Sequence, residues 1–144
     1  MMEFVYAYAY FILYAFLGWV CEDLYCGIPT KKFINRGFFY GPYCPIYGVG
    51  ALLVLYPLLF VKDYPILVFV LGVIITSALE YITSWVMEIL FKTRWWDYSE
   101  RFMNINGRVC LLNSTLFGIM SIVVIYIIHP IIQDIVMDIP FTAL

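Results

Sequence analysis

Four long apolar segments separated by short polar stretches dominate the hydrophobic pattern of this 144-residue chain. They run over residues 4–20, 45–61, 65–91 and 109–128. A helix needs about 20 apolar residues, with a range of roughly 17–25, to cross the hydrocarbon core of a bilayer. The pattern therefore predicts an all-α membrane protein with four transmembrane helices, which form a single transmembrane domain over residues 1–144.

The composition supports this reading, because 65% of the residues are apolar and only 12% are charged. A soluble domain has roughly a quarter of its residues charged. Nucleic-acid binding requires a basic face, which the eight Lys and Arg residues of this chain do not supply. The first apolar segment follows Glu3 instead of a basic region, and Glu22 and Asp23 come after it. It is therefore interpreted as a retained helix and not as a cleaved signal.

The segment between the first two predicted helices is rich in glycine and proline. These residues argue against a continuous helix from Cys26 to Pro45, and the predicted helix before them ends at about Val20. Phe38, Phe39 and neighbouring tyrosines also make the segment too apolar for a simple solvated loop. Two interpretations stay open: a partly re-entrant segment over about residues 33–48, packed against protein, or an interfacial loop.

The residue pattern of the C-terminal part predicts a different kind of membrane contact. Pro130 is expected to end the fourth helix at about Ile128, because proline lacks the N–H that a helix interior needs. Residues 131–139 then alternate isoleucine and valine with Gln133 and two aspartates. This pattern predicts a short amphipathic segment that lies on the membrane surface.

The orientation follows from the basic residues of the predicted loops. Seven of the eight lie in the first and third loops, and the short second connection contains only Lys62. Basic residues in short loops stay on the cytoplasmic side. The first and third loops are thus predicted to be cytoplasmic, with both termini outside. The seven residues are Lys31, Lys32, Arg36, Lys92, Arg94, Arg101 and Arg108.

The third apolar segment has one polar face. Ser77, Glu80, Tyr81, Ser84 and Glu88 fall within an arc of about 100° when successive residues are separated by 100°. A carboxylate at the bilayer centre costs about 2.5–3.5 kcal/mol, so this face is expected to lie inside the bundle. Glu88 is near the predicted cytoplasmic end and can reach water. Glu80 is deeper in the segment and is predicted to face an internal polar site.

Arginines near the same ends of the other segments are the expected partners of these carboxylates. Arg36 and Arg108 suit this role, because a guanidinium can hold a carboxylate in two-point contact. Two interpretations stay open: a polar rim with helix caps, or a buried network that opens to the cytoplasm and binds a substrate. The candidate substrate-binding residues are Glu22, Arg36, Glu80, Ser84, Glu88, Asp97, Arg108, Asn113 and Ser114.

No metal or cofactor is predicted. The four cysteines all fall on the predicted cytoplasmic side, where they are expected to be reduced thiols. Neither a CxxC spacing nor a nearby histidine supports a zinc site. The lone His129 is expected at the outer end of a helix, and no hydrolase or metalloprotease motif occurs.

Four sequence blocks resemble a small bacterial membrane family labelled "putative ABC-transporter permease, type IV". They are GW-x-x-E from Gly18, NRGFFYGPYCPIYGVG, EYITSWVMEILF and RWWDYSERFMNINGRVCLLNSTLFG, and the resemblance covers nearly the whole chain. It implies a subunit of the bacterial cell membrane that works with a separate ATPase. The motif positions that carry over are Trp19, Glu22, Arg36, Gly37, Gly41, Pro42, Pro45, Tyr47, Gly48, Glu80, Glu88, Trp95, Trp96, Asp97, Asn104, Gly107, Arg108, Cys110 and Ser114.

Three functions are compatible with these residues. The first is a transport subunit in which Glu80 and Glu88 line a path for a cation, proton or basic solute. With only four predicted spans and no obvious coupling helix, it would need a homo-oligomer or a partner to enclose that path. The second is a membrane-embedded enzyme that acts on a lipid or lipid-linked substrate. The third is a structural or regulatory protein whose polar network fixes helix packing.

Overall fold

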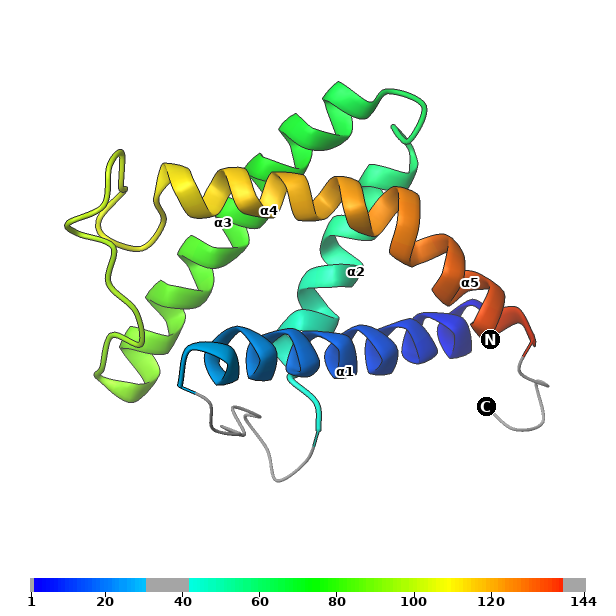
Figure 1. Ribbon diagram of the computed structural model, residues 1–144, viewed down its shortest axis with the longest axis horizontal. Coiled ribbons are helices and arrows are strands. Elements are labelled where there is room, and N and C mark those ends of the chain that lie inside the picture. Colours follow the sequence, from blue (N-terminus) through cyan, green and yellow to red (C-terminus); the bar gives the residue numbers. More distant parts are fainter. Residues whose placement is uncertain (1, 31–41, 139–144) are drawn as a thin grey trace. The chain divides into compact units, whose positions relative to one another are not determined.

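The computed structural model describes residues 2–30 and 42–138, with side chains described from residue 4 onward except at 22 and 25–30. Within these ranges the regular structure is helical (Figure 1), apart from one isolated bridge between Ile105 and Val109. The prediction of an all-α protein is confirmed. The elements are α1 (Met2–Thr30), α2 (Pro45–Leu59), α3 (Pro65–Phe91), α4 (Leu111–Val123), a π-helical turn (Val124–Ile128) and α5 (His129–Asp138).

Three of these helices are long and apolar enough to cross a membrane. The candidate spans are Phe4–Cys21 in α1, Pro65–Phe91 in α3 and Leu111–Asp138, which covers α4, the π turn and α5. The fourth helix, α2, is apolar but has only 15 residues, fewer than the roughly 17 that a perpendicular span needs. The chain is therefore a multi-pass membrane protein, with four apolar helices in the part that the structure describes.

The predicted re-entrant segment lies partly outside the described residues, since residues 31–41 are not described. From Pro45 onward the chain is helical, with proline in the first turn, where its missing N–H is not needed. The N–H of Cys44 donates to the carbonyl oxygen of Ala15 at 2.9 Å, which fixes the start of α2 beside α1. The re-entrant arrangement stays a prediction.

Two helices extend beyond the ends expected from the sequence. α1 continues past Val20 to Thr30, through Gly27 and Pro29. A helix tolerates proline in its interior at the cost of one hydrogen bond and a clash with the carbonyl four residues earlier. The glycine and proline residues at the end of α1 were therefore weaker helix breakers than expected.

The last helix does not end before Pro130, and this prediction was wrong. The chain passes from α4 through the π turn Val124–Ile128 directly into α5. Proline lacks the N–H that a helix interior needs, and a wider π turn such as the one before Pro130 is a common way for a helix to absorb this local defect. Residues 131–138 thus continue a long helix, in which Ile132 and Val136 are buried.

The helices form two compact units. The first contains α1, the start of α2 as far as Leu53, and α5; the second is Val54–Ile128. The prediction of a single transmembrane domain stays a prediction.

In the first unit, α1 packs against both α2 and α5. Small residues allow the close approach of α1 and α2, because a Cβ at Gly48 would lie 2.7 Å from the Phe11 ring. Against α5, the hydroxyl of Tyr14 lies 3.2 Å from Nδ1 of His129, and the Tyr10 ring meets the imidazole edge-on. His129 is only 5% exposed and lies at the junction with the π turn, inside a continuous helix and not at its end.

In the second unit, α3 crosses α4 at a pair of glycines. A Cβ added to Gly72 would lie 2.6 Å from the hydroxyl oxygen and 2.7 Å from Cβ of Ser121. On the facing helix, Gly118 packs against Phe69 and Val73 in the same way. Helices in lipid gain little from the hydrophobic effect, so close backbone approach and van der Waals contact hold such a crossing together. The crossing places the polar face of α3 beside the start of α4.

Substitution of Gly72 by valine is expected to force α3 and α4 apart, because the new side chain overlaps Ser121. The expected loss is about 1–3 kcal/mol of unfolding free energy, measured by denaturation of the purified protein in detergent. Ala78→Val is the control, since Ala78 is exposed on the same helix. Equal stability of the two variants would contradict this packing.

Candidate functional site

The candidate site is a polar seam in the second unit, which we define as the α3 residues Ser77, Glu80, Tyr81, Ser84 and Glu88 with their partners. Helical geometry places these side chains on one face of α3. The partners come from the connection 92–110 and from the first turn of α4. The connection folds back along α3, so residues distant in sequence reach successive turns of the helix.

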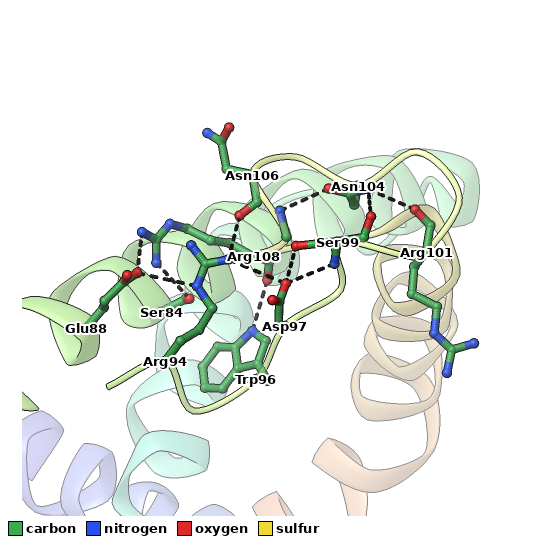
Figure 2. Close-up of polar contacts among 11 residues, drawn as sticks. Ser84, Glu88, Arg94, Trp96, Asp97, Ser99, Arg101, Asn104, Asn106 and Arg108 are labelled. Carbon is green, nitrogen blue, oxygen red and sulfur yellow. Dashed lines mark hydrogen bonds and ion pairs between the residues drawn. The ribbon is translucent and has the colours of Figure 1, made fainter. Parts of the chain in front are cut away.

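At one end of the seam, Arg108 joins two turns of α3 (Figure 2). Its Nη2 lies 2.6 Å from Oε2 of Glu88, and its Nη1 donates to the hydroxyl of Ser84 at 3.0 Å. The guanidinium also lies 5.7 Å from the centre of the Tyr81 ring. The Arg108 side chain is 11% exposed and that of Glu88 is 36% exposed, so the pair is partly shielded from water.

The connection 92–110 is organised to present Arg108 at this position. The indole N–H of Trp96 donates to the carbonyl oxygen of Arg108 at 3.0 Å. The backbone N–H of Tyr98 donates to the carbonyl of Gly107 at 2.7 Å. Gly107 has φ +67°, a left-handed conformation that favours glycine, and a Cβ there would collide with Asp97. The connection is therefore a defined turn, not a loose loop.

Asp97 has a structural position in this turn. Its carboxylate accepts hydrogen bonds from the hydroxyl and the backbone N–H of Ser99, and Arg94 lies 3.4 Å away (Figure 2). The Ser99 hydroxyl, its N–H and the Arg94 charge hold the pKa of the Asp97 carboxyl below its ordinary value. The ionised Asp97 carboxylate therefore stabilises the folded protein at neutral pH, and this stabilisation is lost as the pH falls through the lowered pKa. Arg94 also lies 3.6 Å from Glu88, which links the turn to the seam.

Deeper along α3, Glu80 belongs to a second group of contacts. The amide of Asn113 donates to the hydroxyl of Tyr98 at 2.6 Å, and this hydroxyl donates to Oε1 of Glu80 at 3.1 Å. The other carboxylate oxygen, Oε2, is buried and makes no hydrogen bond within the described residues. One turn further, the hydroxyls of Ser77 and Ser114 are 2.7 Å apart. The seam thus continues from the end of α3 towards its middle.

The structure brings most of the predicted residues together in two groups and one separate pair. Arg108 unites Ser84 with Glu88, whereas Tyr98 unites Glu80 with Asn113; Ser114 pairs with Ser77. Asp97 joins only indirectly, through Arg94. The side chain of Glu22 and all of Arg36 lie outside the described residues.

Sequence reasoning missed Tyr98, which connects α3 to α4. The residue occurs in the predicted loop beside two tryptophans and two charged residues, where a tyrosine is most simply an interfacial side chain. Its hydroxyl reaches Glu80 only because the connection turns back along the helix. No spacing in the sequence marks this contact.

These features define a class: a multi-pass, all-helical membrane protein with a charged and hydrogen-bonded seam along one of its spans. The chain belongs to the family described as "Putative ABC-transporter type IV", which it matches over residues 9–144. Comparison with curated proteins and with solved structures found no match.

Replacement of Arg108 by glutamine is expected to leave Glu88 without its nearest cation. Breaking a fully buried pair costs more, but Glu88 is partly exposed and Arg94 is near, so we expect a loss of about 2 kcal/mol in unfolding free energy. Arg101→Gln, an exposed arginine of the same connection, is the control. Thermal unfolding in one detergent compares the variants.

The double variant Arg108→Leu, Glu88→Leu removes both charges and should regain part of this loss. If the double variant is as unstable as Arg108→Gln, the ion pair is not what holds this end of the seam.

Proposed function

We propose that the chain is a membrane subunit of an ABC transporter and that its polar seam contacts a transported cation, proton or basic solute. The observation that carries this proposal is Glu80, a carboxylate within the 27-residue apolar helix α3. Ionisable residues within spans are costly and typically mark ion or substrate pathways.

The two carboxylates of the seam have different surroundings, which supports different roles. Glu88 is compensated by Arg108 and, at longer range, by Arg94. Glu80 takes part in none of the ion pairs within the described ranges, and its Tyr98 contact is a neutral hydroxyl. A carboxylate whose side-chain partners, Tyr98 and Asn113, are both neutral is suited to accept a proton or a cationic donor. We therefore assign solute or proton binding to Glu80 and positioning to the Glu88–Arg108 pair.

The same proposal gives roles to the other candidate residues. Ser84 orients the guanidinium, Asn113 orients the Tyr98 hydroxyl, and Ser114 extends the hydrogen-bonding surface from α4. Asp97 shapes the turn that presents Arg108. Glu22 and Arg36 belong to the proposed set through the charge pattern of the sequence alone.

An ATPase partner and a homo-oligomer complete the proposal. The family description supports a separate ATPase. Four apolar helices are few to enclose a path, which supports assembly of several copies. The connection 92–110, with the exposed Arg101, is the proposed contact for the ATPase.

The proposed orientation places the connection 92–110 in the cytoplasm and both termini outside, as the seven-to-one distribution of basic residues indicates. Alkaline phosphatase fused after Leu144 should be active, whereas its insertion at Arg101 should be inactive. An inactive fusion after Leu144 together with an active insertion at Arg101 would contradict this orientation.

Glu80→Gln tests the transport function, because the amide keeps the shape of the side chain but does not take up a proton or a full charge. The complex is purified gently from native membranes, its partners are identified by mass spectrometry, and its ATP hydrolysis is measured. We expect a stoichiometric ATPase to co-purify with wild type and variant, and hydrolysis to fall about tenfold in the variant, equivalent to about 1.4 kcal/mol.

Glu100→Gln is the matched control, since Glu100 is an exposed carboxylate of the connection 92–110. It should behave as wild type. If Glu80→Gln instead lowers the amount and stability of the protein without changing hydrolysis per complex, the seam has a structural role. Absence of any ATPase partner would contradict the transporter assignment.

A further inference from the structure

A surface pocket opens at the C-terminal end of α3, beside the Glu88–Arg108 pair. It has a volume of about 300 Å³ and is lined by Trp85, Glu88, Ile89, Lys92 and Arg108. The first three lie on the last two turns of α3, Lys92 follows the helix, and Arg108 precedes α4. The pocket therefore combines two cations, one carboxylate and two large apolar side chains.

The charges of the pocket do not cancel. Arg108 and Glu88 neutralise one another at 2.6 Å. Lys92 makes no ion pair within the part of the chain that the structure describes, and its side chain is exposed. The pocket thus has one excess positive charge, located at Lys92, and the acidic side chain on its wall is already compensated. These conditions favour an anionic ligand.

An exposed apolar strip leads from the pocket along α3. Trp85 and Ile89 are 51% and 49% exposed, and Ile82 and Ile74 are 55% and 57% exposed. At 100° per residue these four positions lie within an arc of about 80°, adjacent to the polar face. The strip continues from the charged pocket into the apolar span Pro65–Phe91. A ligand that fills both parts must have an anionic head and a long apolar tail.

The pocket also lies at the end of an apolar span, where lipid headgroups are expected. Lys92 directly follows the last residue of the span, Phe91. The ring centres of Phe91 and the half-exposed Trp95 are 5.7 Å apart. Tryptophans of this kind lie at the membrane–water interface, and basic side chains next to a span attract anionic headgroups.

We propose that this pocket binds an anionic phospholipid, with the headgroup phosphate at Lys92 and Arg108 and an acyl chain along the strip Trp85, Ile89, Ile82 and Ile74. A free phosphate would use the two cations but would leave the strip uncovered. The site shares Glu88 and Arg108 with the seam, but Lys92 has no part in the proposed transport, so a Lys92 variant tests the lipid site separately.

Native mass spectrometry of the purified full-length chain tests this site. The protein is delipidated, then titrated with phosphatidylglycerol or phosphatidylcholine of the same acyl chains. Wild type should retain phosphatidylglycerol in preference to phosphatidylcholine. Lys92→Gln should lower the retained phosphatidylglycerol about fivefold, as expected for one lysine near an anionic headgroup. Lys92→Arg keeps the positive charge and should retain the lipid. This result would show that Lys92→Gln acts through the lost charge and not through a loss of folding.

Lys62→Gln is the matched control, because Lys62 is a basic residue at another helix end of the second unit and lies outside the pocket. It should bind as wild type. Equal retention of both lipids, or equal losses for Lys62→Gln and Lys92→Gln, would overturn the proposal. Full displacement of the lipid by an equal concentration of glycerol phosphate would overturn it too, because the apolar strip would then contribute nothing.

Discussion

Charge compensation at the end of α3 is the interaction on which the second unit depends. Glu88 lies on an otherwise apolar helix, and its cation comes from Arg108, on the far side of a long connection. Arg108 reaches it only when the connection turns back, and the Trp96 indole and the Tyr98–Gly107 backbone bond hold that turn in place. The conformation of residues 92–110 and the pairing of α3 with α4 therefore support one another.

The same constraint separates the two carboxylates of α3. Near the helix end, Glu88 has an arginine within contact distance and partial access to water, and both compensate its charge. Eight residues earlier, Glu80 has only neutral side-chain partners, Tyr98 and Asn113, within the described residues. In the proposed function a solute or proton binds at Glu80, because at Glu88 it would compete with an existing ion pair. The excess charge at Lys92 has an equally local origin, because Glu88 is engaged by Arg108.

The sequence predicted which segments are helical but not where each helix ends. An apolar run of this length must be helical in lipid, because every backbone N–H and C=O has to be satisfied within the segment. Local rules failed at the end of α1, which continues past the predicted end at Val20 to Thr30, and at Pro130, where proline was expected to end a helix that continues. At Pro130 the adjacent π turn accommodates the missing hydrogen bond, and burial of Ile132 and Val136 stabilises the helix beyond it. Packing of this kind involves residues far apart in sequence, so local propensity does not reveal it.

The sequence by itself determined the membrane class, the all-helical architecture and the polar face of α3, because composition and a period of 3.6 residues are local properties. It also identified Arg108 as a candidate partner by charge. Only the tertiary structure decided that Arg108 bridges Ser84 and Glu88, that Tyr98 links Asn113 to Glu80, and that Lys92 borders a pocket. These contacts depend on how the connection 92–110 reverses direction. That reversal depends on a left-handed glycine and a few long-range hydrogen bonds, whose partners no sequence spacing identifies.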